Sequence, residues 1–538
     1  IVLIAAVVLV CAYAGYGRWL AKTWGVDPNA KTPAVRLEDG KDYVPTNGWT
    51  VFAHQFSSIA GAGPVTGAIQ AAAFGWLPVL LWVLIGGVFF GAVTDFGALY
   101  ASVKNDGKSM GMLIEKYIGK TGRKLFLLFC WLFCGIVIAA FADMVAGTFN
   151  AFDAEGAQVE AAFTNGAAGM VSIMFMVFAV VFGFIQKKFN FSGWREAVIG
   201  IVFIVLSFAV GMNCPLVFGK AAWSYITFVY IFFAAVLPMW MLKQPRDYMT
   251  TFMFGAMIAG AVIGLLVAHP TMNLPVFTAF NNAKLGTMFP ILFVTVACGA
   301  VSGFHSLVSS GTSSKTVENE KDMLKVGYGA MVLESLLAVL ALCVAGAAAA
   351  ADGTPATGTP FQIFSRGVAG FFEMFGVPVS IATVFMTMCV SALALTSLDA
   401  VARIGRMSFQ ELFSVDDMEH AEGWRKLCCN VYFSTFITLV FGFILTQIGY
   451  ANIWPLFGSA NQLLSALVLA TLCVFLKVTG RNNKMLFPPL VIMLCVTFTA
   501  LVQRLIAMVK AISAAASTAI PAGETTWGAV FIANGLQL

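Results

Sequence analysis

Charged side chains are scarce in this sequence. Asp, Glu, Lys and Arg make up 11% of the 538 residues, whereas hydrophobic residues make up 59%. Soluble domains carry about 25% charged residues, so a water-facing surface of ordinary composition is excluded. The mean hydropathy of +0.87 indicates that most of the surface faces lipid. The length then predicts one bundle of many helices rather than several soluble domains.

Several chemical signatures are also missing. The sequence has no Walker loop, which argues against ATP-driven transport within this chain, and it has no HExxH, GxSxG or nucleotide-binding GxGxxG. The 11 Cys are scattered through apolar runs without a CxxC pair. We therefore expect them to be small buried hydrophobic residues, and we predict no metal site and no cofactor. Nothing in the sequence indicates a nucleic-acid partner.

Long apolar runs are abundant instead, and about 20 such residues in a helix cross the hydrocarbon core. A helix satisfies its own backbone groups there, whereas an open sheet does not. We predict an all-α polytopic membrane helix bundle with about fifteen transmembrane spans. They are expected at 1–20, 51–76, 77–103, 124–148, 167–186, 195–212, 221–242, 250–268, 287–310, 326–350, 378–402, 427–447, 452–476, 485–508 and 526–538. The numbering is expected to begin part-way into a helix, and the last span to be incomplete.

The distribution of Lys and Arg predicts the orientation of these spans. The segments between spans should alternate between the two sides of the membrane. If the first of them, 18–50, lies inside, then 26 of the 31 Lys and Arg fall in segments on the inner side. The five outside are Lys220, Lys284, Arg366, Arg504 and Lys510. Because Lys and Arg are enriched in cytoplasmic loops, we expect span 51–76 to run from inside to outside. Two loops, Lys108–Lys120 inside and Gln362–Phe375 outside, carry the pattern of short interfacial helices.

The segment His54–Gly67 interrupts a span with residues that break helices. Gly61, Gly63 and Pro64 come at mid-span. Pro64 has no N–H to donate and disfavours the α conformation at Gly63. We predict a discontinuous helix, whose freed carbonyls near Ser58–Ala60 suit a cation and whose following half-helix presents its N-terminus to a carboxylate. Close packing through small residues is the alternative, which we prefer for two pairs elsewhere, Gly87-x-x-x-Gly91 and Gly260-x-x-x-Gly264.

A second polar segment lies at 295–312. Thr295, Ser302, His305, Ser306 and Ser309 recur near helical spacing, which predicts a stripe of hydroxyl and imidazole groups on one helix face. Two of the four His of the sequence, His54 and His305, lie in the two polar segments. The stripe favours a binding site. The alternative is that the hydroxyls bond to their own helix and that the histidine is a satisfied interior residue.

Further polar groups stand at membrane depth, where such groups mark function. Asp95 and Asp143 have no neighbour of opposite charge in the sequence, which suits proton carriers. Asp399 and Arg403 are four residues apart, which predicts a self-contained ion pair. The remaining groups are Glu334, the pair Asn461 and Gln462, and the helix end that contains Pro238, Arg246 and Asp247. For that helix end, interface anchoring is as well supported as a gate.

These motifs resemble the carbon starvation protein A (CstA) family, in order and along most of the chain. The matching stretches are His54–Gly67, Leu77–Pro78 with Thr94–Phe96, Leu237–Tyr248, Ala297–His305 with Ser310–Thr312, Leu398–Asp399 with Arg403, and Trp454–Gln462. The sequence is expected to be shorter than some members and without their extended C-terminal region, either by truncation or because it belongs to a shorter subfamily. The resemblance implies a bacterial inner-membrane secondary transporter that imports peptides or pyruvate during carbon starvation, coupled to protons or sodium.

The resemblance also implies a leucine-transporter-like fold of the amino acid–polyamine–organocation (APC) superfamily, with a 5+5 inverted repeat. We expect an extra span and loop at 1–50, the first repeat at 51–212, the second at 213–402 and additional spans at 403–538. Span 221–242, interrupted near Ala234–Pro238, would open the second repeat, and the stripe at 295–309 would lie on the eighth core helix. In sodium-coupled relatives of that fold, hydroxyls there and carbonyls of the first broken helix bind sodium.

The roles that follow are assigned to three groups of residues. Substrate binding is assigned to His54, Ser57, Ser58, Gly61, Ala62, Gly63, Thr66 and His305. Ion coupling is assigned to Ala60, Ser302, Ser306, Ser309, Asp95 and Asp143, with His305 as an alternative proton carrier. Gate or structural roles are assigned to Pro64, Pro238, Arg246, Asp247, Asp399, Arg403, Asn461 and Gln462. The expected partners are the substrate and membrane lipids.

The residues alone leave rival functions open, and they predict no enzyme. One rival is a membrane nutrient sensor that binds substrate without flux. Another is a membrane-embedded metalloprotein that uses His54, His305 and Cys298. The sequence does not choose between pyruvate and peptides, nor does it determine the coupling ion or the oligomeric state.

Overall fold

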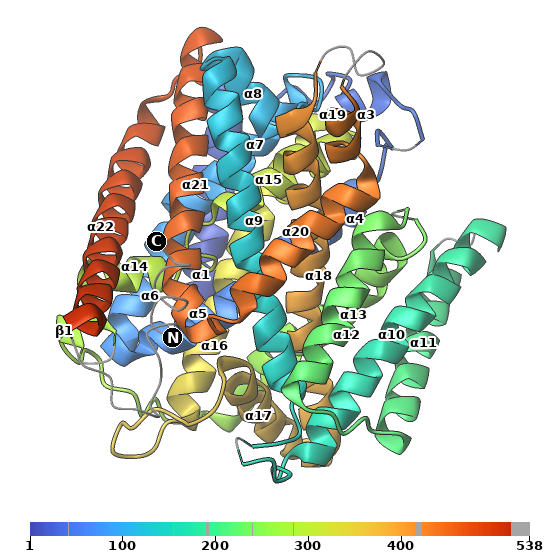
Figure 1. Cartoon of the computed structure of the whole chain (residues 1–538), viewed down its shortest axis with the longest axis vertical. Helices are drawn as coiled ribbons and strands as arrows, with labels where there is room; N and C mark the ends of the chain where they lie inside the picture. The colour runs from blue at the N-terminus through green and yellow to red at the C-terminus, as the bar shows by residue number, and fades with distance from the viewer. Residues whose placement is uncertain are drawn as a thin grey trace.

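The protein is described by a computed structural model that covers residues 1–40, 42–153, 155–189, 193–238, 240–282, 285–415 and 422–517. Helices dominate these residues (Figure 1). A short antiparallel hairpin of β1 (Asn281–Asn282) and β2 (Gly286–Thr287) lies in one loop. The predicted all-α fold class is confirmed.

Ten helices within the described residues are long and apolar enough to cross a membrane. Two of them are compound: α1 (Val2–Ala12) leads into α2 (Arg18–Trp24), and α6 (Trp76–Gly86) leads into α7 (Ala92–Val103), each through a π-helical turn. The others are α9 (Lys120–Phe149), α10 (Ala162–Phe189), α11 (Trp194–Asn213), α13 (Lys243–Ala268), α16 (Ala330–Ala348) with the turns before it, α18 (Val379–Phe413), α21 (Tyr450–Val478) and α22 (Phe487–Ser517).

Two shorter apolar helices, α12 (Lys220–Val236) and α20 (Val431–Thr446), complete the continuous spans of the described region. They correspond to the predicted spans at 221–242 and 427–447. The last predicted span, 526–538, lies outside the described residues, so the count of about fifteen stays a prediction.

The predicted discontinuous helix at 51–76 is present as two half-helices. α4 (Gly48–Ile59) begins at Asn47, whose side chain accepts a hydrogen bond from the backbone N–H of Trp49, and it ends where Ala60 leaves the helical conformation. α5 (Gly63–Ala71) then begins with Pro64 in its first turn. Proline is well placed there, because the first amides of a helix have no intrahelical partner. The break at 60–62 follows from the local sequence.

A second span is broken as well, which the sequence did not predict. α14 (Met288–Thr295) and α15 (Gly303–Gly311) are separated by a non-helical stretch at 296–302, in which Ser302 is fully extended. The prediction that Thr295 and the hydroxyl groups of 302–309 share one helix face is therefore wrong, because the helix ends between them. Only the residues from 303 onward share a helix.

The interruption predicted near Ala234–Pro238 is not a break within one span. α12 ends at Val236, Leu237 is extended, and α13 begins at Lys243. The residue before a proline is pushed out of the α conformation, so Pro238 ends α12 and opens the connection to the next helix. This connection therefore joins the ends of two separate helices and does not interrupt a single one.

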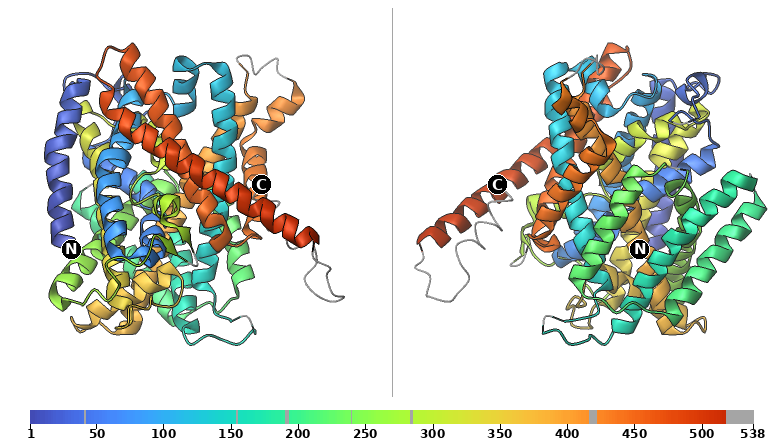
Figure 2. Two further views of the ribbon diagram at one scale, coloured as in Figure 1. Left: turned by 90° about the vertical axis from the view of Figure 1, so that its left-hand side faces the viewer. Right: turned by 45° about the vertical axis from the view of Figure 1, so that its right-hand side comes forward.

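Pairs of helices pack in two matching sets. α4 packs against α13, as α14 packs against α21, and α5 packs against α16, as α15 packs against α7. α9 and α18 form the central pair, with α12 against α9 and α20 against α18. α10 and α11 stand apart from this scheme, and they form a hairpin at the edge of the bundle (Figure 2). α22 lies obliquely across the outside.

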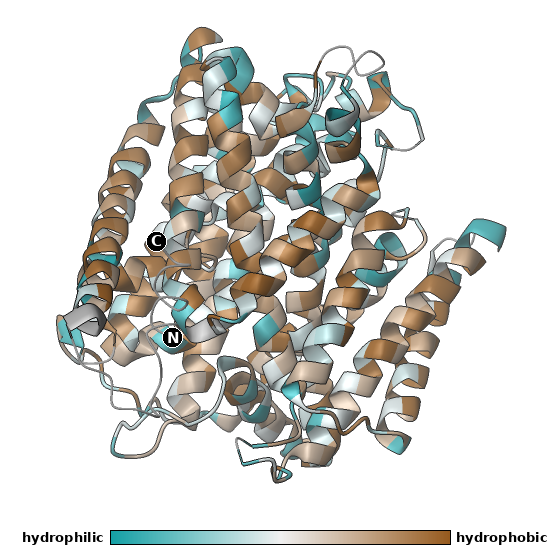
Figure 3. Cartoon of the chain, in the orientation of Figure 1, coloured by the Kyte–Doolittle hydropathy of each residue, from teal (hydrophilic) through white to brown (hydrophobic). Residues whose placement is uncertain are grey.

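The helices are coloured mainly as hydrophobic along their length, and hydrophilic segments gather toward the two ends of the bundle (Figure 3). Large hydrophobic side chains are exposed along α1, α11, α20 and α22, as expected for helices that face lipid. The two predicted interfacial helices are present as α8 (Met110–Tyr117) and α17 (Pro360–Glu373), which lie at opposite ends of the bundle (Figure 1). The short helices α3 (Pro33–Arg36) and α19 (Gly423–Cys428) lie at the α8 end.

The orientation can be tested by chemical labelling of a cysteine-free chain. Thr357 lies in the exposed loop before α17, and Lys484 is exposed at the opposite end, between α21 and α22. Since the cationic end is expected inside, Thr357→Cys should react with a membrane-impermeant maleimide on intact cells. Lys484→Cys should react only after the membrane is disrupted. The reverse pattern would show that the orientation is wrong.

Candidate functional site

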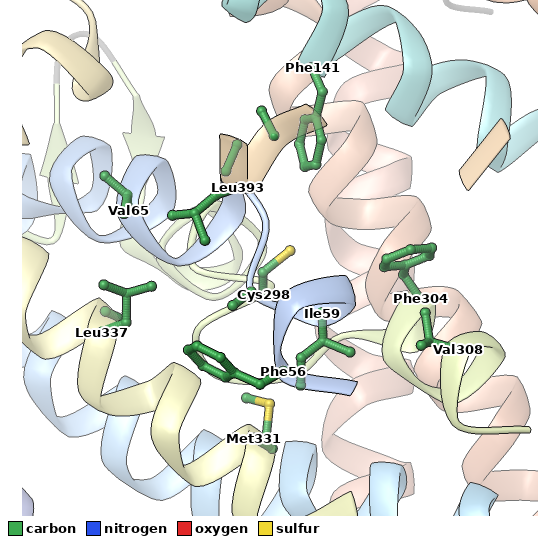
Figure 4. Close-up of a cluster of buried hydrophobic side chains, with 14 of the residues drawn as sticks. Phe56, Ile59, Val65, Phe141, Cys298, Phe304, Val308, Met331, Leu337 and Leu393 are labelled. Carbon is green, nitrogen blue, oxygen red and sulfur yellow. The ribbon is translucent and has the colours of Figure 1, made fainter. Parts of the chain in front are cut away.

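The two breaks of the main chain face each other at the centre of the bundle. A Cβ added at Gly63 would overlap the side chain of Cys298, and one added at Gly67 would lie 2.6 Å from the carbonyl oxygen of Thr295. Glycine is required at both positions because the partner segment approaches so closely. Figure 4 shows Cys298 beside the connection between α4 and α5. The two interrupted helices thus cross where the first turns of α5 contact the unwound stretch of the second broken helix.

Apolar side chains enclose this crossing. Phe56, Ile59 and Val65 from the first broken helix belong to the same buried hydrophobic cluster as Phe141 of α9 and Leu393 of α18 (Figure 4). The predicted site residues Ser57, Ser58, Gly61, Ala62, Gly63 and Thr66 are all buried here. Freed backbone groups can persist at membrane depth only inside protein or beside an aqueous cavity. The enclosure therefore explains how the breaks are tolerated.

The hydroxyl of Ser397 on α18 faces the first break. It donates to the carbonyl oxygen of Ser58 at 3.4 Å and lies against Gly61. Ser58 Oγ is buried without a hydrogen-bond partner among the described residues, whereas Ser57 Oγ donates back to Ala53. A carbonyl of the first broken helix and a hydroxyl of α18 are thus brought together. In the expected sodium site, the hydroxyls came from 302–309 instead.

The hydroxyl groups of the second segment have other neighbours. Ser302 Oγ lies 2.9 Å from Nδ2 of Asn461, whose Oδ1 accepts the backbone N–H of Phe304 at 3.1 Å and so caps α15. Ser309 accepts a hydrogen bond from Gln55 of α4 at 2.8 Å. Ser306 Oγ is buried without a partner in the described part of the chain. These serines link α15 to α21 and α4, rather than forming one stripe.

A fully buried cluster of three titratable side chains lies beside the second break. His305 Nδ1 is 3.0 Å from Asp95 Oδ2 on α7, and His305 Nε2 is 3.3 Å from Glu334 Oε2 on α16. All three side chains have no exposed surface. If both carboxylates were ionised, one protonated imidazole could compensate only one of the two negative charges. Burying the other, uncompensated charge is costly. The arrangement therefore suits groups that share and exchange protons.

A second buried cluster lies nearer the α8 end, between four helices. His54 Nδ1 of α4 lies 3.1 Å from Asp247 Oδ2, and Arg246 Nη2 lies 3.2 Å from Asp247 Oδ1. Arg246 also pairs with Asp399 of α18, which accepts a hydrogen bond from the hydroxyl of Tyr230 on α12 at 2.9 Å. These contacts tie α4, α12, α13 and α18 together, between the central breaks and the predicted cytoplasm.

The predicted pairing of Asp399 with Arg403 is wrong. Asp399 pairs with Arg246, and Arg403 instead donates to the carbonyl oxygens of Ala234 and Leu237, at 2.5 Å and 2.6 Å. Those carbonyls end α12 and have no intrahelical partner, so a guanidinium from a neighbouring helix satisfies them. Spacing along α18 could not reveal this, because both partners come from elsewhere in the sequence.

The remaining predicted residues are placed as follows. Asp143 lies 2.8 Å from Lys220 at the other end of the bundle, so it is paired across α9 and α12. Thr66 Oγ1 donates to Met144 Sδ at 3.4 Å, and Gln462 donates to the carbonyl oxygen of Phe293. His54 lies seven residues before Gly61, which is about 10 Å along a helix. It belongs to the cytoplasmic cluster by position.

A cavity of about 980 Å³ opens at the α8 end. Its walls include Leu307 and Val308 of α15, Cys130 of α9 and Ala400 of α18, and they continue to the α12–α13 connection. The second break directly precedes α15, and Ser397 lies one turn before Ala400 on α18. The cavity therefore extends from beneath the crossing of the broken helices toward the predicted cytoplasm.

Several residues of these clusters had no predicted role: Gln55, Tyr230, Lys243, Glu334 and Ser397. Each is a polar group within or at the end of an apolar run. That signal singled out Glu334 in the sequence, without assigning it a role, and it could have singled out the other four. Tyr230, Gln55 and Ser397 contact Asp399, Ser309 and Ser58, which lie 169, 254 and 339 residues away in the sequence. Sequence spacing could not predict contacts between groups so far apart.

Comparison with known proteins agrees with this geometry. The family described as "Carbon starvation protein CstA" matches residues 1–356 and 347–500. The chain is 31% identical, over 93% of its length, to the peptide transporter CstA of Escherichia coli, 80% of which is covered. It is 36% identical, over 64% of its length, to the pyruvate/proton symporter BtsT of Escherichia coli, 48% of which is covered.

The fold resembles the crystal structure of MhsT in complex with L-phenylalanine, with a TM-score of 0.52 at 12% identity, covering 85% of this chain and 96% of that one. Crossed broken helices in such a bundle define a secondary transporter with the leucine-transporter-like fold, as predicted. The chain belongs to the carbon starvation protein CstA family. It is a multi-pass membrane protein, and its bacterial relatives agree with the predicted inner-membrane location.

The cytoplasmic cluster predicts a stability effect. Asp399→Asn leaves Arg246 without its α18 partner inside the protein, and breaking a buried pair in this way costs about 3 kcal/mol or more. The thermal unfolding temperature of the purified protein should therefore fall by several degrees. The double variant Arg246→Met with Asp399→Leu should recover part of the loss, because neither of these two charges remains.

Lys188→Gln is the matched control, since Lys188 is an exposed cation at the same end of the bundle. It should leave the unfolding temperature unchanged. An Asp399→Asn protein as stable as the wild type would show that the pair does not hold the helices together.

Proposed function

We propose that this protein is a secondary active transporter that imports peptides or pyruvate across the bacterial inner membrane. The observation that carries the proposal is the contact between the two broken helices at the centre of the bundle, where Gly63 at the start of α5 lies against Cys298 in the unwound stretch of the other. The names of the relatives, peptide transporter and pyruvate/proton symporter, support the kind of substrate. We also propose that the chain catalyses no covalent reaction.

The substrate carboxylate is assigned to the first break, at Gly61–Gly63. The opening amides of α5 lack intrahelical partners, and the positive end of the helix dipole points toward the break. Discontinuous helices in transporters present their half-helix ends to substrates and ions in this way. Ser57, Ser58 and Thr66 surround the break, whereas His54 is assigned to the cytoplasmic cluster because its partner is Asp247.

The two five-helix repeats are proposed to begin at the two broken helices. α4–α13 and α14–α21 pack internally in the same way once α10 and α11 are set aside. The second repeat would then open at residue 288 rather than at 213, and the hairpin of α10 and α11 would be an insertion in the first. Under this assignment α18 is the eighth core helix. The hydroxyl expected at a sodium site would then come from Ser397 instead of Ser302, Ser306 or Ser309.

The coupling ion is proposed to be a proton held by Asp95, His305 and Glu334. The cluster joins α7, α15 and α16 directly beside the second break. Gaining or losing a proton would change the charge shared among these helices, and so couple protonation to movement of α15. Sodium is the alternative ion, with the carbonyls of Ser58 and Ala60 and the hydroxyl of Ser397 as its ligands.

The cytoplasmic cluster is proposed to be an inner gate. Arg246 and Asp247 of α13 hold Asp399 of α18 and His54 of α4. α4 is the half-helix that ends at the substrate site, so releasing these contacts would let it move away from the cavity. Arg403 and Pro238 would hold the α12–α13 connection beside this gate.

The substrate assignment is tested with Gly63→Leu. The leucine side chain would occupy the space of Cys298 and keep the two breaks apart, so uptake of labelled pyruvate and of labelled alanyl-alanine by proteoliposomes should be abolished. Gly147→Leu on α9 is the matched control, because a Cβ there meets nothing within 4 Å. Uptake that persists in folded Gly63→Leu would show that the site is misassigned.

Binding without any flux in the wild-type protein would contradict the transporter and favour a sensor.

The coupling ion is tested with an imposed pH gradient across proteoliposomes without sodium. An inward proton gradient should drive accumulation by the wild type, because the cluster carries a proton with the substrate. Glu334→Gln should abolish gradient-driven accumulation, yet retain exchange of labelled for unlabelled substrate, which needs no net proton movement. Uptake that requires sodium and ignores the pH gradient would exclude the proton and favour the site at Ser397.

A further inference from the structure

The cavity at the α8 end carries an excess of positive charge. Its described walls include five cationic side chains but only two carboxylates. The cations are Lys187, Lys243, Lys315, Arg403 and Arg406, and the carboxylates are Asp42 and Glu411. A low-dielectric cleft lined by one sign of charge concentrates ions of the opposite sign. The cavity is therefore built to receive an anion.

Lys243 stands out among these cations. It opens α13, its residue surface is only 4% exposed, and it lines the cavity. No hydrogen bond or ion pair joins its ammonium group to any residue that the structure describes, although Asp247 and Asp399 lie near enough to act on it electrostatically. A lysine buried to this extent is ordinarily paired.

The other buried cations of this region already have partners. Arg246 is held by Asp399 and Asp247, and Arg403 by two backbone carbonyls of the α12 end. The region thus holds three buried cations, Lys243, Arg246 and Arg403, against two carboxylates, Asp247 and Asp399, and both carboxylates pair with Arg246. One positive charge is left uncompensated beside the cavity. Burying an uncompensated charge is costly, and a bound carboxylate would remove that cost.

We propose that Lys243 forms a second carboxylate site, in which the transported molecule rests between the central break and the cytoplasm. This inference rests on the proposed function, because it takes the cavity as the route of release. The ligand chemistry is a carboxylate, which pyruvate and the C-terminus of a short peptide share. Lys243 also lies four residues before Asp247, so occupation of this site adds an anion directly beside the ion pairs of the proposed gate.

The site is tested by comparing transport from the two faces of the membrane. Substrate meets the cavity first in inverted vesicles and last in right-side-out vesicles. Lys243→Gln should raise the half-saturating concentration of labelled pyruvate about tenfold in inverted vesicles. In right-side-out vesicles the change should stay within about twofold. Labelled alanyl-alanine, run in parallel, shows which carboxylate source uses the site.

Two further variants serve as controls. Lys188→Gln removes the same charge from the same end of the bundle, but Lys188 is exposed and does not line the cavity, so both half-saturating concentrations should stay unchanged. Lys243→Arg keeps the charge and should restore most of the affinity from the cytoplasmic face, which separates loss of the charge from a folding defect. Equal half-saturating concentrations for Lys243→Gln and the wild type in inverted vesicles would overturn the proposal.

Binding to purified protein separates this proposal from the proposed function. Pyruvate should raise the unfolding temperature of the wild type and of Lys188→Gln more than that of Lys243→Gln, and the neutral analogue pyruvamide should have no such effect. If the wild type shows this dependence on Lys243 without flux from either face, the site stands and the transporter fails. If flux is normal and neither measurement depends on Lys243, the transporter stands and the site fails.

Discussion

The structure depends on the contact between two interrupted helices. In a lipid environment every freed backbone group must find a partner inside the protein, so a broken helix is stable only where other chain segments enclose it. The stretch at 60–62 is enclosed by α9 and by α18, and the stretch at 296–302 packs against the start of α5. Gly63 and Gly67 permit the close approach, and the packing of α5 on α16 and of α15 on α7 follows from the position of the crossing.

Buried charge is arranged in layers around this crossing. The cluster of Asp95, His305 and Glu334 lies beside the second break, and the cluster of His54, Arg246, Asp247 and Asp399 lies between the breaks and the cytoplasmic end. Each cluster joins helices that the chain itself separates. Movement of a half-helix therefore changes which charges are paired, and this is a physical means by which ion binding, substrate binding and gating can influence one another.

Several particular residues show where sequence-based prediction succeeded and where it did not. The break at Gly61–Pro64 was predicted, because proline and glycine act on their own backbone. The break at 296–302 was missed, because Thr295, Ser302, Ser306 and Ser309 match helical spacing across it and no proline lies within it. Asp399 was paired with Arg403 by spacing, yet its partner Arg246 is 153 residues away. Asp143 had no visible partner, and the structure supplies Lys220.

Composition, apolar run length and charge distribution by themselves determined an all-α membrane bundle, the approximate positions of its spans and a predicted orientation. These properties are set by transfer of side chains and backbone from water to lipid, which acts residue by residue. The tertiary structure decided which helices meet, that two broken helices face each other, and which buried charges form pairs. Those properties depend on contacts between segments far apart in the sequence, and such contacts exist only once the bundle has assembled.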